Sequence, residues 1–379
     1  MPYFLTEEQQ MFRDTARTFA REEVEPVANQ IDHDEATPPH LVRRCAELGF
    51  FGLYIPAEYG GLGAGLTTTC VVLEEIAKAS PAFAGLLSVQ IILCPGVVNL
   101  LGTEAQKRRL LPASARGERL MAYSQTEPAG AGNIVAHQTK LTADGDFFRL
   151  NGAKLFCTQG EAKSYLVMAK TYRDGQEGYG CVIVEQGAPG FIVAPYEDKL
   201  GWRGTNTGSI SFTDVLITPD NVLGDLLTAN ADHALVNQAS FIGHAVTSLG
   251  CVEGMFEKTL EYVKARNLYG EPMHKLSPIS YWLADIHNKI EAARCLLYSS
   301  TKLFDVGQVE KPMGSVCKAY VCQTAFECTN TLLQMWGGNG MMNSTGVNRY
   351  MRDARIKLVA EGATEMHTSI VSQAVLGLV

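Results

Sequence analysis

The segment that decides the fold reads Phe147-Phe148-Arg149-Leu150-Asn151-Gly152-Ala153-Lys154-Leu155-Phe156-Cys157. Its two ends are rich in residues that favour strands, and Asn-Gly supplies the positive φ angles of a tight two-residue turn. The pattern therefore predicts a β-hairpin with strands at 147–150 and 154–157. A hairpin here places strands in the middle of a chain whose two ends show different periodicity.

Short strand-like runs continue after the hairpin and are separated by Gly, Pro, Asp or Asn. These runs are Tyr165–Ala169, Cys181–Glu185, Phe191–Ala194 and Ser209–Val215. We interpret the middle third of the chain, residues 121–228, as an antiparallel β-domain.

Helical spacing dominates on both sides of this β-domain. Thr6 and Gln9 form a capping-box pattern, after which apolar residues recur at helical intervals. Beyond a turn at 218–221, long helical patterns continue to the end and include Val246–Ala265 and Tyr281–Phe304. The sequence thus predicts an α+β protein, with an N-terminal helical domain at 1–120 and a C-terminal helical domain at 229–379.

Composition excludes several classes of function. The 379 residues are 46% hydrophobic and 19% charged, which is typical of a chain with a large buried core. The net charge of −8 comes without the clustered Lys and Arg that nucleic acid binding requires. Glu7 and Glu8 lie where a targeting peptide would be basic, and no stretch is expected to reach the roughly 20 apolar residues of a membrane span. We therefore expect a cytoplasmic protein with no membrane span and no nucleic acid partner.

Motifs of several enzyme classes are missing. The ten cysteines form no Cys-x-x-Cys pair and the eight histidines are scattered, so we expect reduced core cysteines and no metal site. The sequence contains no P-loop, no Gly-x-Gly-x-x-Gly between a strand and a helix, and no Gly-x-Ser-x-Gly. P-loop enzymes, nicotinamide-binding Rossmann enzymes and serine hydrolases therefore have no support.

A series of short motifs remains, each of them weak by itself. They are Leu48-Gly49-Phe50, Ile55-Pro56-x-x-Tyr59-Gly60-Gly61, Thr126-Glu127-Pro128, Asn151-Gly152-x-Lys154, Ala265-Arg266-x-x-x-Gly270, Met335-Trp336-Gly337-Gly338-Asn339-Gly340, Arg352-Asp353-Ala354 and Glu361-Gly362. In order and spacing the series resembles the acyl-CoA dehydrogenase family over nearly the whole chain. Agreement of all the motifs in sequence makes chance implausible.

The resemblance implies an architecture and a chemistry. The fold would include a C-terminal four-helix-bundle domain, with FAD between the β-domain and the C-terminal helices. Glu361 matches the family's catalytic base, which removes an α-proton while the flavin accepts the β-hydride. Its apolar chain neighbours, Val359, Ala360 and Ala363, are expected to raise its pKa towards neutrality. A lone glutamate near the C-terminus would otherwise be a surface charge.

The resemblance also assigns four residues of the β-domain to the flavin ring. Tyr123 and Thr126 belong to the segment that hydrogen-bonds the ring. Phe156 matches an aromatic residue against the ring, although by itself it would be interpreted as a strand core residue. Thr158 matches a hydroxyl near the flavin nitrogen that receives the hydride.

Other cofactor residues are expected to act between subunits. Arg266 would reach the pyrophosphate of FAD in a neighbouring subunit, whereas an isolated arginine on a helix is usually solvated. Gln334 and the Gly337-Gly338 pair would approach the adenosine end, although the pair by itself would only end a helix. Ala363 and Glu365 complete the predicted cofactor residues.

Four residues are predicted to bind substrate, and two positions depart from the family's pattern. Ser88 and Gln90 match the wall of the acyl pocket in glutaryl-CoA-type relatives, and Gly132 and Gly362 complete the set. Gly132 itself stands where a serine commonly contacts the pantetheine arm. Ala84 stands where the glutaryl-type enzymes have an arginine for a distal carboxylate, so a dicarboxylic substrate is disfavoured.

Two further departures concern the segment Ala239-Ser240-Phe241-Ile242-Gly243-His244 and the residue before the base. The family commonly has an arginine in that segment, and this chain has none. Ala360 replaces a bulky aromatic residue of many relatives, which suggests a branched, alicyclic or aromatic acyl group. The altered contacts leave two carriers open, coenzyme A, which we favour, and an acyl carrier protein.

The resemblance implies FAD-dependent α,β-dehydrogenation of an acyl-CoA to the 2-enoyl-CoA, with electrons passed to an electron-transfer flavoprotein. A homodimer or homotetramer is implied by the role of Arg266. The alternatives are the same chemistry on an acyl-carrier-protein thioester, an acyl-CoA oxidase, the reverse reaction as an enoyl reductase, and a non-catalytic scaffold. The presence of Glu361, Thr126, Thr158 and Arg266 together argues against the scaffold.

Overall fold

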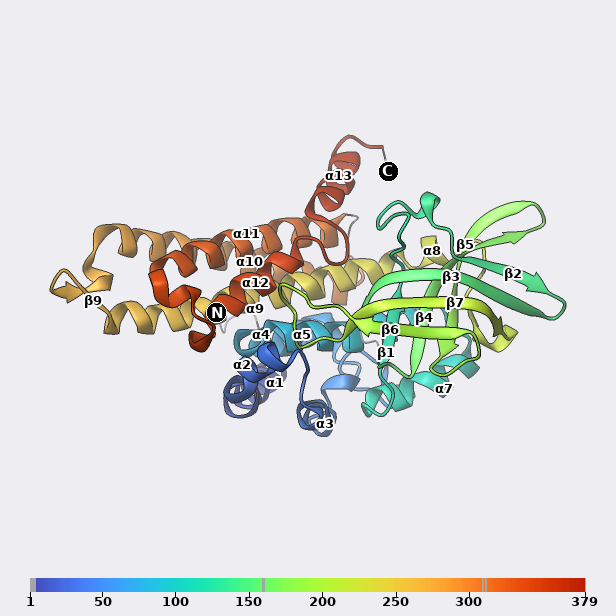
Figure 1. Ribbon diagram of the computed structural model, residues 1–379, viewed down its shortest axis with the longest axis horizontal. Coiled ribbons are helices and arrows are strands. Elements are labelled where there is room, and N and C mark those ends of the chain that lie inside the picture. Colours follow the sequence, from blue (N-terminus) through green and yellow to red (C-terminus); the bar gives the residue numbers. More distant parts are fainter. Residues whose placement is uncertain (1–4, 159–160, 309, 311, 379) are drawn as a thin grey trace.

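The computed structural model describes residues 5–158, 161–308, 310 and 312–378. The molecule is elongated: long C-terminal helices form one end, a β-sheet forms the other, and the N-terminal helices lie along one side (Figure 1). The order of helices, strands and helices predicted from the sequence is confirmed, and with it the α+β fold class.

Helices occupy most of the first 115 residues. They are α1 (Glu7–Phe19), α2 (Ala28–Asp34), α3 (Pro39–Glu47), α4 (Gly65–Ala79), α5 (Pro81–Ser88), α6 (Cys94–Leu101) and α7 (Glu104–Ala115). The capping box predicted at the start of α1 is confirmed. The Gln9 amide donates to Thr6 Oγ1 at 3.2 Å, and the Thr6 amide donates to Gln9 Oε1 at 3.1 Å. Both bonds satisfy main-chain donors that a helix start leaves unpaired.

One apolar helical segment is longer than the sequence analysis expected. α5, the π-helical turn η6 (Val89–Leu93) and α6 together form a 21-residue segment, Pro81–Leu101, that is long and apolar enough to cross a membrane. Within the fold, 89% of its most apolar window is buried. Packing in the core of the protein therefore accounts for its apolar character.

An eight-stranded sheet forms the middle of the chain. Its strands are β1 (Met121–Ser124), β2 (Lys140–Asp144), β3 (Phe147–Thr158), β4 (Ser164–Arg173), β5 (Gln176–Glu185), β6 (Phe191–Tyr196), β7 (Thr207–Ile217) and β8 (Val222–Leu223). The order is β6-β7-β3-β2-β4-β5-β8, with β1 beside β4. The four strand-like runs expected after the hairpin all lie in strands. The sheet is antiparallel except where β4 runs parallel to β1 and β2.

The hairpin predicted at Asn151-Gly152 is wrong. β3 continues through both residues, and the turn lies at Gly145 between β2 and β3. Gly152 has a φ of 141°, at a shift in the register between β3 and β7. A side chain at this position would clash with the main chain of Thr139. The glycine therefore allows a bulge and a close backbone approach, which require the same conformational freedom as a turn.

The C-terminal part is helical, and its long helices run side by side (Figure 1). The helices are α8 (Ala229–Asp232), α9 (Ala234–Ala265), α10 (Ser277–Asp305), α11 (Met313–Trp336), α12 (Asn348–Lys357) and α13 (Thr364–Val375). A small ribbon of β9 (Asn267–Leu268) and β10 (Glu271–Pro272) joins α9 to α10. The expected helical stretches 246–265 and 281–304 lie in α9 and α10.

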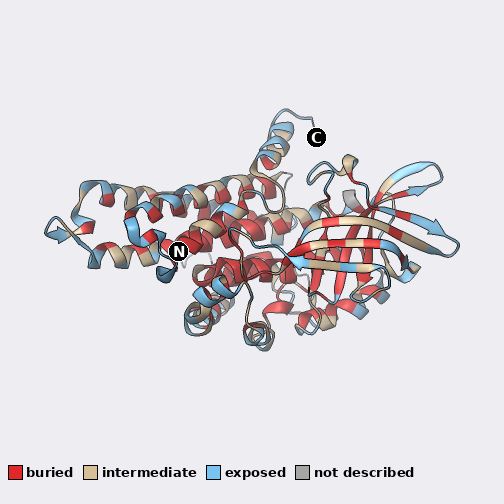
Figure 2. Cartoon of the chain, in the orientation of Figure 1, coloured by how far each residue is buried: buried red, intermediate tan, exposed pale blue. Residues whose placement is uncertain are grey.

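Buried residues concentrate where the N-terminal helices meet α9 and inside the sheet (Figure 2). One core joins helices from both ends of the chain, including α4, α9 and α11. A second core joins α6 and α7 to the strands β1, β4 and β5. α9 therefore packs against chain segments more than 150 residues away in sequence, which gives a rigid support for groups on its surface.

Candidate active site

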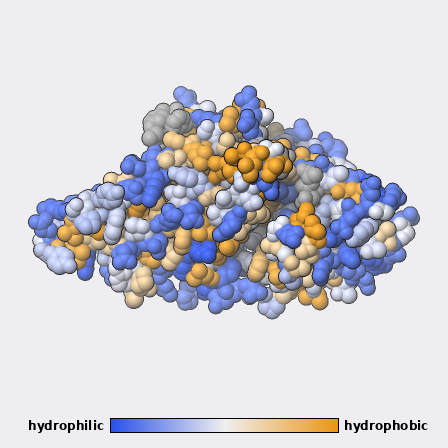
Figure 3. Space-filling view, turned by 90° about the horizontal axis from the view of Figure 1, so that it is seen from above, coloured by the Kyte–Doolittle hydropathy of each residue, from blue (hydrophilic) through white to orange (hydrophobic). Residues whose placement is uncertain are grey.

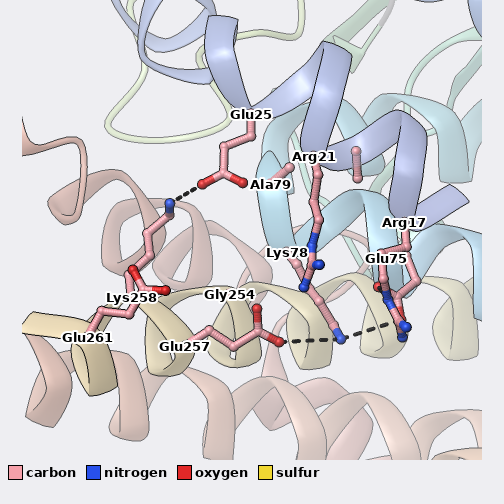
Figure 4. Close-up of a pocket in the computed structure, with 11 residues that line it drawn as sticks. Arg17, Arg21, Glu25, Glu75, Lys78, Ala79, Gly254, Glu257, Lys258 and Glu261 are labelled. Carbon is pink, nitrogen blue, oxygen red and sulfur yellow. Dashed lines mark hydrogen bonds and ion pairs between the residues drawn. The ribbon is translucent and has the colours of Figure 1, made fainter. Parts of the chain in front are cut away.

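A cavity of about 360 Å³ lies between α1, α4 and α9, away from the predicted catalytic residue. Charged side chains of both signs line it, and most are already paired. In Figure 4, Lys258 points at Glu25, and Lys78 lies between Glu75 and Glu257. Because these charges neutralise one another, this cavity offers little to a charged ligand, and the chemistry has to be sought at Glu361.

Glu361 lies in the turn between α12 and α13, in the left-handed region with a φ of 53°. Gly362 follows with a φ of 94°. A left-handed residue with a side chain costs roughly 1 kcal/mol or more, so other groups must hold the turn. Lys318 Nζ donates to the carbonyls of Lys357 at 2.6 Å and Gly362 at 3.1 Å. His367 Nε2 lies 3.0 Å from the carbonyl oxygen of Glu361.

The carboxylate of Glu361 contacts two side chains of α9. Ser240 Oγ lies 2.8 Å from Oε1 and 2.9 Å from Oε2. His244 Nε2 lies 3.0 Å from Oε1, with the ring turned so that neither of its nitrogens makes an aligned hydrogen bond to a described residue. Ser240 and His244 are four residues apart and so share one face of the helix. The Glu361 side chain keeps 18% exposure and remains reachable from outside.

The pKa of Glu361 lies below its ordinary value, which corrects the expectation of a raised pKa. Burial by itself would raise the pKa, but His244, the Ser240 hydroxyl and the charge of Lys357 outweigh burial. Burial also lowers the pKa of His244 to about 4. At neutral pH the carboxylate is therefore ionised beside a neutral imidazole. The apolar chain neighbours did not reveal these contacts because all three groups come from other turns or helices.

A buried lysine lies behind the carboxylate. Lys357 Nζ donates to Thr247 Oγ1 and lies 4.0 Å from the ring centroid of Trp202. Burial lowers the pKa of Lys357 to about 7, although the negative charge of Glu361 opposes this change. The charge of Lys357 thus lowers the pKa of the predicted base, and that charge itself changes near neutral pH.

Tyr123 of β1 lies near the same carboxylate. Its ring stacks on His233 with 5.1 Å between centroids, and its hydroxyl donates to Gln125 Oε1 at 2.9 Å. Burial raises the pKa of Tyr123 and lowers the pKa of His233 to about 4, and the charge of Glu361 acts on both groups. The turn that carries Glu361 and the edge formed by β1 are therefore close neighbours.

Thr126 is held by the strand that carries Phe156. Its carbonyl accepts from the Leu155 amide at 2.8 Å. The next residue, Glu127, makes a buried ion pair with Lys154 at 2.6 Å, and its carboxylate also accepts from the Thr139 amide. These bonds fix the loop after β1 against β3.

Phe156 has a φ of 55° and is 66% exposed, at a second register shift between β3 and β7. The bulge turns a large aromatic ring out of the sheet, which is unusual unless something covers it. Thr158 ends the same strand and is partly buried. The structure therefore places Tyr123 and Thr126 beside the end of β3 that carries Phe156 and Thr158.

The predicted substrate residues fall into two pairs. Ser88 is buried, and its hydroxyl has no hydrogen-bond partner among the described residues. Both ends of the Gln90 amide bond to the main chain of Met121, at 2.6 and 2.9 Å, and so tie η6 to β1. Gly132 and Gly362 face one another across Met366, because a side chain on either glycine would touch that methionine.

The remaining cofactor residues lie elsewhere. Ala363 caps the start of α13 beside Glu361, and Glu365 is exposed in its first turn. Arg266 follows the last residue of α9 and is exposed, at the end where Tyr262 stacks on Trp336 of α11 with 4.0 Å between centroids.

Gln334 is exposed near the end of α11, and side chains on Gly337 or Gly338 would meet open space. Within one chain these residues lie far from Phe156. The long C-terminal helices separate the end of the molecule that carries them from the end formed by the sheet (Figure 1).

Sequence reasoning missed the residues that surround Glu361. They are Ser240, His244, Lys318, Lys357 and His367. The sequence identifies 239–244 only as the place of a missing arginine. The available signal was a pair of polar residues at helical spacing within an apolar stretch of α9. Such a pair often consists of buried side chains that are hydrogen-bonded within the core.

Comparison with known sequences supports the family expected from the motifs. The acyl-CoA dehydrogenase N-terminal domain matches residues 6–118, the middle domain matches 122–215, and the C-terminal domain matches 240–376. A short-chain specific acyl-CoA dehydrogenase of Clostridium acetobutylicum is 32% identical, over 98% of this chain and 99% of its own. An acryloyl-CoA reductase (NADH) of Anaerotignum propionicum is 33% identical, over 99% of this chain and 96% of its own.

A solved structure agrees with the family match and with these two relatives. Butyryl-CoA dehydrogenase from Megasphaera elsdenii matches with a TM-score of 0.94 at 32% identity, over 98% of this chain and 99% of its own. The chain belongs to the acyl-CoA dehydrogenase family. The expected enzyme class, a flavoprotein oxidoreductase, is thereby confirmed.

Proposed function

We propose that this enzyme dehydrogenates a saturated acyl-CoA thioester to the 2-enoyl-CoA, with Glu361 as the base that removes the α-proton. A general base has to be deprotonated and reachable at the working pH. The observation that carries the proposal is that Glu361 meets both conditions, because its pKa is lowered and its side chain is partly exposed in a turn beside β1.

We propose FAD as the cofactor, held where the end of β1 lies beside the end of β3. Phe156 offers an exposed ring, Thr126 and Thr158 offer hydroxyls, and the buried His233 Nε2 has no partner among the described residues. Such groups suit a flat, polar-edged ring system. When bound, FAD supplies the acceptor for the β-hydride.

The chain also offers a donor for the thioester oxygen. The α-proton becomes acidic enough to remove only when the carbonyl oxygen is stabilised as negative charge develops on it. No described residue accepts a hydrogen bond from the main-chain amide of Glu361. We propose that this amide donates to the thioester oxygen, while the carboxylate of the same residue receives the proton.

The acyl group we propose is branched, alicyclic or aromatic. Ala360 is a small residue directly before the base, which leaves room near the reacting carbons. Ala84 is fully buried and offers no cation to a distal carboxylate, so a dicarboxylic acyl group is disfavoured. Coenzyme A is the proposed carrier, and an acyl carrier protein is the alternative because Gly132 lacks a hydroxyl.

We propose that two copies of the chain complete each cofactor site. Arg266, Gln334 and the Gly337-Gly338 pair lie far from Phe156 in one chain, so another copy has to supply them. The helix α13 projects from the body (Figure 1) and leaves Val375, Leu376 and Leu378 exposed. On the face from which it projects, hydrophobic side chains gather near the middle (Figure 3). Exposed apolar area of this kind is typical of an interface.

Reduction of a 2-enoyl thioester is the second candidate, with the same residues acting in reverse. The relative named as an acryloyl-CoA reductase favours it. An electron-transfer flavoprotein is the proposed electron partner in either direction, and direct transfer to oxygen would make the enzyme an oxidase. A measurement of oxygen consumption separates the oxidase from the dehydrogenase.

An anaerobic titration of the purified holoenzyme tests the proposal. Butyryl-, isobutyryl-, cyclohexanecarbonyl- and phenylpropionyl-CoA are added in turn, and the flavin band at about 450 nm is followed. We expect bleaching by at least one class. Flavin that no acyl-CoA bleaches, but whose reduced form is reoxidised by a 2-enoyl-CoA, would support the reductase instead. Failure in both directions would contradict the proposed function with coenzyme A thioesters.

A further inference from the structure

α9 presents two polar side chains to the carboxylate of Glu361 from a part of the helix that is otherwise apolar. Ala239, Ile242 and Ala245 beside them are all fully buried. A polar side chain in such surroundings lowers stability unless it has a partner. For Ser240 that partner is the carboxylate, since its hydroxyl lies within 2.9 Å of both oxygens.

His244 has the same dependence on the carboxylate. It is 1% exposed, and its ring lies beside Trp202 with 5.4 Å between centroids. No described residue makes an aligned hydrogen bond to either ring nitrogen, whereas Oε1 of Glu361 lies 3.0 Å from Nε2. A rotation of the ring that points an Nε2–H at this oxygen would give the imidazole a partner. The tautomer protonated at Nε2 is therefore the one that can donate to this oxygen.

The other titratable groups around Glu361 act on it differently. From the elements packed around the carboxylate they are Lys318 of α11, Lys357 of α12, His367 of α13, Tyr123 of β1, Cys94 of α6 and His233 directly before α9. Lys318 and His367 bond to main-chain oxygens of the turn, and Lys357 bonds to Thr247. Among the described residues, Ser240 and His244 are the ones whose side chains touch the carboxylate oxygens.

We propose that Ser240 and His244 are positioning residues that together hold the carboxylate of Glu361 ionised and in one orientation for proton abstraction. This inference rests on the proposed function of Glu361 as the base.

Two donors beside the carboxylate would restrain it more than either one alone. A hydroxyl placed between both oxygens stops the carboxylate from rotating, and a second donor on one oxygen selects which of them faces the buried side. Hydrogen bonds to the charged form also oppose the effect of burial, which would otherwise protonate the carboxyl group. Removing either donor should therefore raise the pKa of Glu361 and loosen its orientation.

The chain offers matched variants for the test. Ser240→Ala removes the hydroxyl and Ser240→Thr keeps it. His244→Gln places an amide nitrogen near the position of Nε2, while His244→Asn carries the same amide only as far as the position of Nδ1. Ser248→Ala is the control, because Ser248 is buried on the same helix and donates to the carbonyl of His244.

Two measurements on the holoenzyme separate this inference from the proposed function. The first is an infrared titration of the substrate-free enzyme against pH, in which Glu361→Gln identifies the band of the protonated Glu361 carboxyl. The second is the pH profile of kcat and KM with butyryl-CoA, or with the acyl-CoA that bleaches the flavin best. Flavin content and thermal unfolding confirm that each variant is folded.

In Ser240→Ala and His244→Asn we expect the pKa of Glu361 to rise by about one unit or more. The acidic limb of the kcat profile should move with it, and kcat should fall at least tenfold while KM changes little. Ser240→Thr and His244→Gln should recover most of the loss, and Ser248→Ala should match the wild type. An unchanged pKa of Glu361 in folded Ser240→Ala and His244→Asn, or an equal shift in Ser248→Ala, would overturn the inference. The infrared result stands even if no acyl-CoA reduces the flavin, which would count against the proposed function alone.

Discussion

The ammonium group of Lys357 lies 4.0 Å from the ring centroid of Trp202, fully buried behind the turn that carries Glu361. Burial lowers the pKa of Lys357 to about 7, against 10.5 in an unfolded chain. The unfolded state therefore binds this proton more tightly than the folded state between these two pH values. Folding stability that is present above pH 10.5 is lost as the pH falls towards and through 7.

Lys357→Met should remove this dependence. We expect the difference in unfolding free energy between wild type and variant to change with pH between 7 and 10, by about 4 kcal/mol at most, with the wild type relatively less stable at the lower pH. Urea unfolding at a series of pH values measures this difference. Parallel pH curves for the two proteins would show that Lys357 remains charged or solvated in the fold.

Glu361→Gln should abolish most of the turnover and leave the protein folded. The amide keeps the shape of the side chain but cannot accept the α-proton, so kcat should fall roughly 100- to 10,000-fold. Flavin content should match the wild type. Glu327→Gln, which changes an exposed glutamate on α11, is the control. Turnover near the wild-type rate in Glu361→Gln would exclude Glu361 as the base.

Arg266→Ala should weaken FAD binding if a second copy supplies this side chain. Loss of a charge-assisted bond to a phosphate is expected to cost roughly 1.5–3 kcal/mol, which corresponds to about a 10- to 150-fold increase in Kd. Titration of the apoprotein with FAD measures this increase. Lys264→Ala is the control, since Lys264 is exposed two residues earlier. Equal affinity in both variants would contradict a cofactor site that two copies complete.

Arg294→Met should strongly destabilise the helical core. Arg294 of α10 pairs with the buried Glu74 of α4, and its other terminal nitrogen lies 2.9 Å from Glu253 of α9. Removal of the cation takes the ion-pair partner from the buried Glu74, which keeps the Tyr298 hydroxyl, and leaves Glu253 with Lys78 at 3.1 Å. The expected cost is about 3–5 kcal/mol. Lys289→Met removes an exposed ion pair with Asp285 on the same helix and should cost at most about 1 kcal/mol. Comparable midpoints of urea unfolding for the two variants would contradict this role of Arg294.

The sequence was sufficient for the order of the elements and for the family. Apolar periodicity and the capping pair Thr6 and Gln9 depend only on residues close in sequence. The helices and strands that they predict are therefore present in the fold. The Asn151-Gly152 pair shows where this reasoning fails. A positive φ at glycine is compatible with a turn and with a bulge, and the approach of Thr139, directly before β2, decides between them.

The contacts that hold Glu361 could not be predicted for a similar reason. Ser240 and Glu361 are separated by 121 positions, and nothing in their local sequence indicates that they touch. The expectation of a raised pKa used only the chain neighbours of Glu361. Charges and hydroxyls from other helices reversed the direction, because electrostatic effects depend on distance in space.

One helix connects the support of the proposed base to the residue proposed to bind a neighbouring copy's cofactor. Ser240 and Arg266 lie along α9 about 39 Å apart, at 1.5 Å per residue. If Arg266 binds the cofactor of a neighbouring copy, the helix that steadies one base is anchored by the other copy's FAD. FAD bound to one copy would then increase the catalytic activity of the other copy. Partly loaded preparations would show less activity per bound flavin than fully loaded ones.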